Sequence, residues 1–308
     1  VIKIKKGLDI NLKGKASDVL LNGGKSESYA IVPDYYNGIL PKVVAKVGEK
    51  VKAGSVLMID KNRPEIKFVS PVSGEVTAVN RGEKRKVLSI VVKPDAQIEY
   101  EEFGKKNVAS LQGAEVKEVL LNAGMWPFIK QRPYDIVAAP LDTPRDIFVS
   151  AFYSAPLAPN FDFIVKGQEA DFQTGLNALA KLTNGKVYVG VRSGSVVSGM
   201  KGVEIVEVEG PHPAANVGVQ INHIKPVNKG EVVWTVNPAD VIVIGRLFNK
   251  GVADFSRMVA ITGSETTERG YVKTISGCTI KSLVNGKVLG QEHIRIISGN
   301  VLTGTKVN

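Results

Sequence analysis

The sequence predicts an α/β protein whose central α/β part lies between all-β modules. Two changes of residue pattern lead to this prediction. Short runs rich in Val and Ile, separated by glycines, fill residues 1–100, helical and strand spacings alternate over 101–249, and strand patterns return over 250–308. A chain of 308 residues is long enough for three such modules.

The first module contains the stretch VGEKVKAGSVLMIDKNRPEIKFVSPVSGEV, residues 47–76. Its glycine-marked hairpins are typical of a lipoyl/biotinyl-like barrel-sandwich domain, in which a lysine beside an aspartate carries the prosthetic group. Lys61 follows Asp60 here, but the interval from Lys61 to Pro71 is longer than in carriers and includes Pro64. The biotin signature of a lysine between two methionines is absent. We therefore predict an unmodified surface Lys61, with a lipoate- or biotin-type covalent carrier using Lys61 as the alternative.

The middle module alternates helix and strand patterns. Strand, helix and strand at this spacing indicate a βαβ unit, so we expect a Rossmann-like parallel sheet. Asp171 or Thr174 would cap the second helix. No G-x-G-x-x-G loop and no P-loop follows a strand. The expected elements are helices at 107–126 and 175–185, and strands at 147–151, 186–191, 203–210 and 236–245, the last reading VNPADVIVIG.

The third module, over 250–308, has the pattern strand, turn, strand, short helix and turn in MVAITGSETTERGYVKTISGCTIKSLVNGKV, which predicts a β-grasp domain of the soluble ligand-binding type. SGCT, at 276–279, faintly resembles segments around threonines that carry flavin through a phosphoester. Ser and Thr also cap helices, and we favour that interpretation. The chain stops soon after a strand, which we interpret as a fragment of a longer protein.

Charge and composition narrow the classes of partner. A net charge of +10 favours an anionic partner, but the basic residues are spread along the chain and aromatic residues around their one cluster, 81–86, are sparse, so we predict no nucleic acid. One cysteine and three histidines cannot form a disulfide framework, an iron–sulfur cluster or a usual structural zinc site. No apolar run is long enough to cross a bilayer, so we expect a soluble or peripheral protein.

Two loops carry candidate functional residues. His212 lies between two prolines in EGPHPAANVG, where it is either a functional loop residue or a cap for a backbone carbonyl. GMWPFIKQRPYD, residues 124–135, gathers Trp126, Phe128 and Tyr134 with Lys130 and Arg132. Such a loop is able to hold a planar quinone head group by stacking, with a cation near its carbonyl oxygens. It is equally suited to packing between domains or to docking.

Several segments together resemble the A subunit of the sodium-pumping NADH:quinone oxidoreductase of bacteria. They are IKIKKGLDI, the carrier-like module, FIKQRPYDIVAAPLDTPRDIFVSA, GPHPAANVG and RIISGNVLTG. The resemblance covers the whole chain, and that family continues beyond its end. It implies a peripheral subunit on the cytoplasmic face of the bacterial inner membrane, which docks on the membrane-embedded B subunit and is linked to quinone (ubiquinone) binding. The resemblance also implies that electrons pass through flavins and an iron–sulfur centre on other subunits and that sodium moves through the membrane part.

The modules also resemble the flavin subunit of respiratory complex I and its relative, the C subunit of the Rnf complex. In those proteins a glycine-rich loop cradles the FMN phosphate, whereas this chain has GMWPFIKQ there. Carboxylates are expected where SAFYSAPL has Tyr153 and Ala155. We therefore expect no cofactor bound by this chain. We assign no catalytic residue and no metal ligand, and take Trp126, Phe128, Arg132, Tyr153 and His212 as candidates for a quinone- or partner-facing surface.

Overall fold

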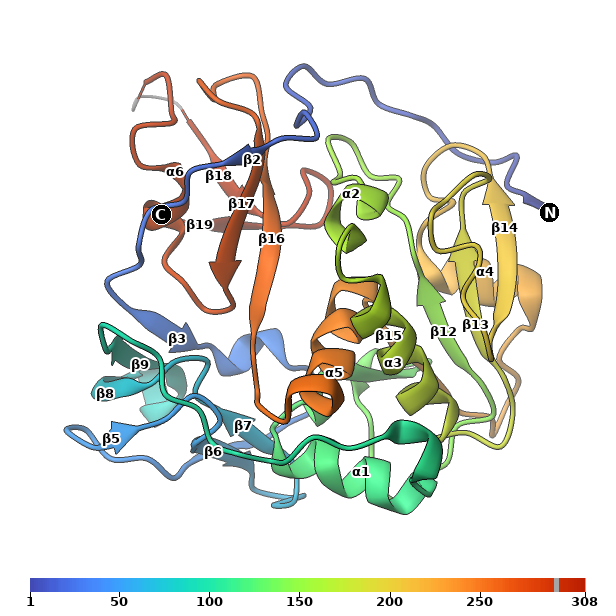
Figure 1. The fold of residues 1–308 in the computed structure, drawn as a ribbon. Coiled ribbons are helices and arrows are strands. Elements are labelled where there is room, and N and C mark those ends of the chain that lie inside the picture. The colour runs from blue at the N-terminus through green and yellow to red at the C-terminus, as the bar shows by residue number, and fades with distance from the viewer. Residues whose placement is uncertain (291–293, 308) are drawn as a thin grey trace.

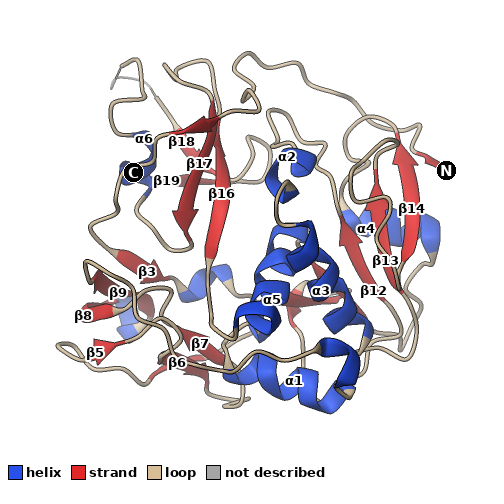
Figure 2. Ribbon diagram, viewed as in Figure 1, coloured by secondary structure: helices blue, strands red, loops and turns tan. Residues whose placement is uncertain are grey.

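A computed structural model describes residues 1–290 and 294–307. Five sheets form the body of the molecule (Figures 1 and 2). A large mixed sheet with its helices fills one half. Two small antiparallel sheets lie below the third module in the other half.

The first module consists of two antiparallel sheets that enclose an apolar interior. Leu57, Met58, Val76, Ile90 and Val92 are fully buried between them. Alternation along β8 and β9 turns one side of each strand inward. One sheet has the order β3 (Tyr29–Ile31), β9 (Val87–Pro94), β8 (Gly74–Arg81), β5 (Lys50–Val51), and the other β4 (Pro41–Val43), β6 (Val56–Asp60), β7 (Lys67–Val69), with η1 (Pro33–Tyr35) and η2 (Glu83–Arg85) as short turns.

The middle module is built on a seven-stranded sheet with a parallel centre. Neighbours from β1 to β15 run parallel, whereas β10 and β11 are antiparallel. The expected parallel sheet is therefore present, with an antiparallel edge. The strand order is β1 (Ile2–Lys3), β14 (Glu204–Glu209), β13 (Val187–Val191), β12 (Ile147–Ser150), β15 (Val233–Val236), β10 (Ile129–Arg132), β11 (Ile136–Val137).

Helices cover both faces of this sheet. Alternation along β12 sends Val149 into the main core and Phe148 into a second cluster with Ile221 of α4. α3 and α5 pack closely on the main-core face, where Gly245 approaches the Asp171 carbonyl. The helices are α1 (Gly113–Asn122), α2 (Phe161–Val165), α3 (Glu169–Ala180), α4 (Val217–Ile224) and α5 (Pro238–Lys250), with η3 (Val108–Ser110) and η4 (Trp126–Phe128).

Two expectations for the middle module were wrong. VNPADVIVIG is not a strand: β15 ends at Val236, and α5 begins directly after it. The Asn237 side chain accepts a hydrogen bond from Ala239 N, and Pro238 takes the first turn, so the helix starts there. α3 begins at Glu169, so Asp171 and Thr174 both lie inside the helix and neither is its cap.

The third module contains the elements expected from its pattern. Its sheet has the order β16 (Ser256–Ile261), β17 (Gly270–Ile275), β2 (Leu20–Leu21), and the short helix is α6 (Ile280–Val284). Thr279 occupies the N-cap position of α6, but its side chain makes no capping hydrogen bond and its hydroxyl lies 3.2 Å from Ser26 Oγ instead. A separate hairpin joins β18 (Ile296–Ser298) and β19 (Thr305–Val307).

The N-terminal residues belong to the sheets of the other two modules. The alternating stretch over 1–14 forms only the short strand β1, which pairs with β14, and β2 pairs with β17. Residues 4–19 between them cross the molecule as the dark blue segment at the top of Figure 1. We call residues 4–19 the strap.

Candidate functional site

The carboxyl ends of β12, β13, β14 and β15 lie along one edge of the parallel sheet, where α/β folds place their ligands. The loops that follow β12 and β14 carry Tyr153 and His212. The structure thus brings these two sequence-predicted residues to the same edge. We call the set Tyr153, Ser154, Arg192, His212 and Asn237 the carboxyl-edge cluster.

Hydrogen bonds connect the loops of the carboxyl-edge cluster. Ser154 Oγ lies 3.0 Å from His212 Nδ1 and accepts a hydrogen bond of 3.0 Å from Ala215 N. Tyr153 Oη donates to Asn237 Oδ1 at 3.2 Å. Asn237 Oδ1 therefore accepts hydrogen bonds both from Tyr153 and from the backbone N–H of Ala239 at the start of α5. Side-chain hydrogen bonds hold the loops in register. Ser154 and His212 form a hydrogen-bonded pair, but none of the five residues supplies the carboxylate of a Ser/His/Asp set.

Burial controls the ionisation of Tyr153. It raises the pKa of the phenol well above its usual value, and the nearby Asp240 carboxylate acts in the same direction. Asp240 itself pairs with Arg257 at 3.0 Å. Tyr153 is a neutral hydrogen-bond donor to Asn237 at physiological pH.

The strap closes over the His212 loop. Leu8 N donates to His212 O at 2.9 Å, and His212 N donates to Asp9 Oδ1 at 2.8 Å. Gly7 lies so close that a Cβ there would meet His212 O at 2.2 Å, so a side chain would push the strap away. Arg192 braces the other side of the loop, because its Nη2 donates to Gly210 O at 2.7 Å.

The structure separates the remaining three candidates from this edge. Trp126 is fully buried, donates its indole N–H to Ala138 O at 2.8 Å and contacts Trp234 edge to face. It presents no surface to a quinone or a partner. Phe128 is half-buried against Phe255 of the third module.

Arg132 lies at the opposite, amino-terminal edge of the sheet. It pairs with Val233, the first residue of β15, because β10 runs antiparallel to β15. The guanidinium lies 3.4 Å from Asp135 and lines an open cavity of about 250 Å³. Its Nε is buried without a hydrogen-bond partner among the described residues. The cavity residues are Arg132, Pro133, Gly218, Ile221, Asn222, Pro226 and Val227.

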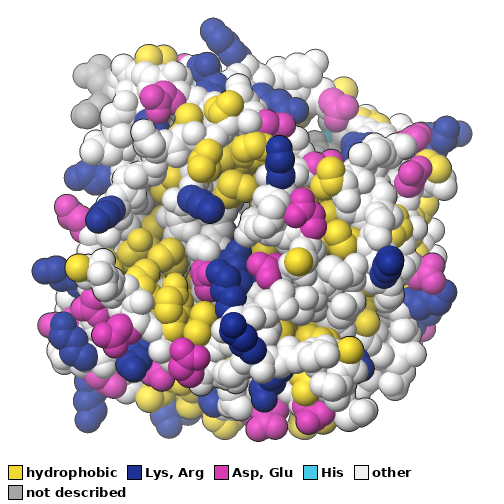
Figure 3. Space-filling model, viewed as in Figure 1, with side chains coloured by type: hydrophobic (Ala, Val, Ile, Leu, Met, Phe, Trp, Pro, Cys, Tyr) yellow, Lys and Arg dark blue, Asp and Glu magenta, His cyan; other side chains and the backbone are white. Residues whose placement is uncertain are grey.

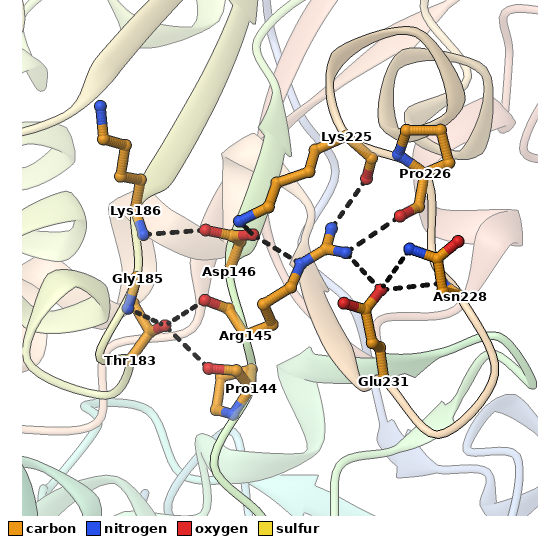
Figure 4. Close-up of polar contacts among 10 residues, drawn as sticks. All are labelled: Pro144, Arg145, Asp146, Thr183, Gly185, Lys186, Lys225, Pro226, Asn228 and Glu231. Atoms are coloured by element: carbon orange, nitrogen blue, oxygen red, sulfur yellow. Dashed lines mark hydrogen bonds and ion pairs between the residues drawn. The ribbon is translucent and has the colours of Figure 1, made fainter.

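A buried carboxylate organises the same amino edge (Figure 4). Asp146 at the start of β12 accepts hydrogen bonds from Arg145 Nε at 2.8 Å and Lys186 N at 3.0 Å, and pairs with Lys225 at 2.8 Å. Burial favours a raised pKa for Asp146, but the hydrogen bonds from Lys225, Lys186 and Arg145 outweigh it and lower the pKa. Arg145 also holds the loop after α4 by donating to Pro226 O and bonding to Glu231. This network stabilises the fold, and sequence reasoning missed it.

Sequence reasoning also missed a contact between the first and the middle modules. Lys130 Nζ lies 5.3 Å from the ring centroid of Tyr36, which comes from the first module. Burial lowers the pKa of Lys130 and raises that of Tyr36 to about 12. The sequence marks Lys130 only as a cation in an aromatic loop. Its partner is 94 residues away in the chain, so no local pattern could identify it.

Lys61 lies on a hairpin that is fixed to the middle module. The preceding Asp60 carboxylate is buried and accepts from Arg63 Nε at 2.7 Å, and Arg63 Nη1 donates to Val137 O at 3.1 Å. The Lys61 amide itself donates to Leu40 O at 2.7 Å. Lys61 is exposed, but its turn is anchored on both sides.

Two kinds of feature are missing from the described residues, 1–290 and 294–307. No helix there is long and apolar enough to cross a membrane. No group of three His, Cys, Asp or Glu side chains there is arranged to hold a metal ion. His293 lies outside the described residues.

Three family models match successive parts of the chain. The NqrA N-terminal barrel-sandwich hybrid domain matches residues 2–95, the NqrA second alpha/beta domain 111–253, and the NQRA C-terminal domain 258–308. The A subunit of the Na(+)-translocating NADH-quinone reductase of Photorhabdus laumondii is 37% identical over 310 residues, which is 99% of this chain and 69% of that protein. The chain belongs to the NqrA family. The barrel-sandwich and α/β expectations for the first two modules are thereby confirmed.

Other relatives of the NqrA family agree. The corresponding A subunits of Hahella chejuensis and Neisseria meningitidis are 38% and 36% identical, and each alignment covers 99% of this chain and 69% of the relative. A solved NAD+-reducing [NiFe]-hydrogenase aligns with 66% of this chain and 47% of its own at 10% identity, with a TM-score of 0.40, which is too low to establish a shared fold.

Proposed function

We propose that this chain is a peripheral docking subunit of a sodium-translocating NADH:quinone oxidoreductase. The identity of 37% over 99% of the chain to an NqrA relative is the observation that carries the proposal. The oxidoreductase activity belongs to the complex, and this chain positions partners. Its partners would be the membrane-embedded B subunit and the other subunits, at the cytoplasmic face of the bacterial inner membrane.

We propose further that the chain binds no flavin and no iron–sulfur cluster. Trp126 and the neighbouring Met125 are fully buried at the loop where the flavin subunits have glycines, so their side chains take the space that a phosphate would need. Cys278 is the only cysteine, and a cluster held by four thiolates needs more. The electrons would then pass through flavins and the iron–sulfur centre on other subunits.

The proposed place for a quinone follows from the strand order of the middle module. The strand order β14-β13-β12-β15 supports a Rossmann-like half, whose switch point would lie between β12 and β15. Tyr153 and Asn237 stand at that point. We propose that this edge, with His212, contributes to quinone binding, and that the third module is a β-grasp domain used for docking.

Native expression of the full-length protein with an affinity tag, followed by purification from mild-detergent membranes, tests the proposal. We expect the membrane subunits to co-purify with covalent flavin and sodium-stimulated NADH:quinone activity. Recovery alone, with added mass on Lys61, would establish the covalent carrier instead. Recovery alone with a flavin absorption band would establish an independent flavoenzyme.

Variants separate quinone handling from docking. Tyr153→Phe and His212→Ala should raise the apparent KM for quinone while the yield of intact complex stays unchanged. His223→Ala is the matched control, because the ring of this exposed histidine on α4 bonds to Val219 O of its own helix. A loss of complex yield in the first two variants, with no change in KM, would assign the edge to docking alone.

A further inference from the structure

The strap is held to the body at two glycines. Gly7 contacts the His212 loop, and Gly14, with φ +103°, accepts a hydrogen bond of 2.8 Å from Gly263 N of the third module. A Cβ at Gly14 would meet the Gly263 backbone at 2.3 Å. Residues 8–13 between these two points form neither helix nor strand and lie on the surface. Their side chains are therefore presented by a backbone that is fixed at both ends.

The strap places its apolar side chains in solvent. Leu8 is 71% exposed, and Ile10 and Leu12 are each 43% exposed. Asp9, between Leu8 and Ile10, accepts a hydrogen bond from the body at His212 N. The Asp9 carboxylate thus bonds to the body of the protein, whereas the three large aliphatic side chains remain exposed to solvent. Three exposed aliphatic side chains within five residues give this segment an apolar surface, and apolar surface rimmed by polar residues marks interaction sites.

Lysines flank these aliphatic residues. Lys5, Lys6, Lys13 and Lys15 are exposed, and none forms an ion pair with another residue that the structure describes. The only acidic residue over 5–15 is Asp9, whose carboxylate is engaged by the body. The strap therefore presents four positive charges, unpaired within the described part of the chain, around an aliphatic centre.

The kinds of residue decide which partner fits. Protein interfaces are enriched in aromatic residues and Arg and depleted in Lys, and residues 5–15 contain four lysines, no aromatic residue and no Arg. Aliphatic side chains bordered by lysines suit an anionic bilayer surface, where the apolar groups enter the headgroup layer and the ammonium groups meet phosphates. We propose that the strap is a contact surface for anionic phospholipid. This inference goes beyond docking to protein subunits and does not depend on it.

Co-flotation of the purified 308-residue chain with vesicles tests the inference. We expect binding to vesicles of phosphatidylcholine mixed with phosphatidylglycerol, weak binding to phosphatidylcholine alone, and release by high salt. Substitution of Lys5, Lys6, Lys13 and Lys15 by Gln should weaken binding about five-fold per lysine. Leu8→Ser combined with Ile10→Ser and Leu12→Ser should also release the protein, although the net charge is unchanged. Far-UV circular dichroism checks that each variant is folded.

The basic hairpin tip between β8 and β9 supplies the matched control. Substitution of Arg81, Lys84, Arg85 and Lys86 by Gln removes the same charge from a different surface (Figure 1). Lys and Arg are dispersed over the face in Figure 3, so general attraction would weaken equally in both variants. Equal loss in the two charge variants, or equal binding to both kinds of vesicle, would overturn the inference. The vesicles contain no other protein, so this outcome leaves the proposed function untouched.

Discussion

At the residue scale, Asp146 is the buried charge on which the amino edge of the sheet depends. Its side chain is 1% exposed, and it compensates Arg145 and Lys225. Asp146→Asn keeps the shape but leaves Lys225 without its anion and leaves Arg145 paired with Glu231 alone. Because Lys225 is 47% exposed and can turn to water, we expect a loss of about 2 kcal/mol in the free energy of unfolding, measured by urea denaturation.

The pair between Lys186 and Glu204 is the control for Asp146. Its side chains are 59% and 49% exposed, so Glu204→Gln should leave the urea midpoint nearly unchanged. Equal effects of the two substitutions would show that burial of Asp146 contributes nothing.

A second carboxylate, Asp254, predicts the acid sensitivity of the protein. Burial favours a raised pKa, but hydrogen bonds from Ser256 and Lys250 and the nearby Arg246 lower the pKa from 3.8 to about 2. A carboxyl with a depressed folded-state pKa stabilises the fold above its unfolded-state pKa, and this stabilisation is lost as pH falls toward the folded-state value. We expect the free energy of unfolding to fall between about pH 4 and 2, and to fall less steeply in Asp254→Asn. Parallel pH profiles for the two proteins would contradict this assignment.

At the scale of elements, the packing of α3 on α5 depends on Gly245. A Cβ at this position would meet the Asp171 carbonyl at 1.7 Å, so Gly245→Ala would force the two helices apart. We expect a loss of about 2 kcal/mol in the free energy of unfolding, as for other overpacked cores. Thermal or urea unfolding measures it.

Gly218→Ala is the matched helix control. Gly218 lies in α4, and its nearest neighbour across the missing Cβ, Arg132 Nη1, is 3.8 Å away. Alanine favours helix more than glycine, so this variant should be as stable as the parent or up to about 1 kcal/mol more stable. A destabilised Gly218→Ala would mean that helix propensity does not govern α4.

Helices and strands whose apolar residues follow one clear period could be predicted from the sequence, whereas α5 could not. Four consecutive β-branched residues, Val241 to Ile244, favour a strand by their composition. They form a helix because Asn237 and Pro238 start one, and because every residue from Val241 to Phe248 is buried, with α3, α2 and β16 packed against α5. Burial on all sides removes the polar face by which a helical period is recognised.

The site was predictable only in part, for a topological reason. Tyr153 and His212 follow parallel strands, and parallel strands end at a common edge, so their proximity follows from the βαβ pattern. Arg132 is the last residue of β10, which runs antiparallel to β15, so it lies at the opposite edge, and no local signal reveals that reversal. Trp126 lies in a segment that has the composition of a surface aromatic loop, but its side chain is buried in the core beside Trp234.

At the scale of the whole molecule, the N-terminal segment predicts cooperative unfolding. β1 pairs in the middle module, β2 in the third and β3 in the first, so residues 2–31 connect all three. Both tryptophans, Trp126 and Trp234, lie in the middle module and contact each other. Fluorescence therefore reports that module alone, whereas far-UV circular dichroism reports every module. We expect the two thermal transitions to coincide.

Weakening the strap should separate these transitions. Gly14→Val adds a side chain where the Gly263 backbone lies within 2.3 Å and where φ is positive, so the contact between residues 14 and 263 would be lost and the link to the third module weakened. The dichroism midpoint should then fall below the fluorescence midpoint. Coincident transitions in Gly14→Val would show that the strap does not couple the modules.

The pairing of β1 and β2 also sets an order of events during synthesis. Ile2 pairs with Val208 and Leu20 with Tyr271, so the two strands leave the ribosome 206 and 251 residues before their partners. At roughly 5–20 residues per second, these strands wait on the order of ten seconds or more with open edges. Both strands are only two residues long, which limits what they can pair with in the meantime. The residues nearest the amino terminus are thus among the last to reach their native positions, and they complete two sheets that later residues have already built.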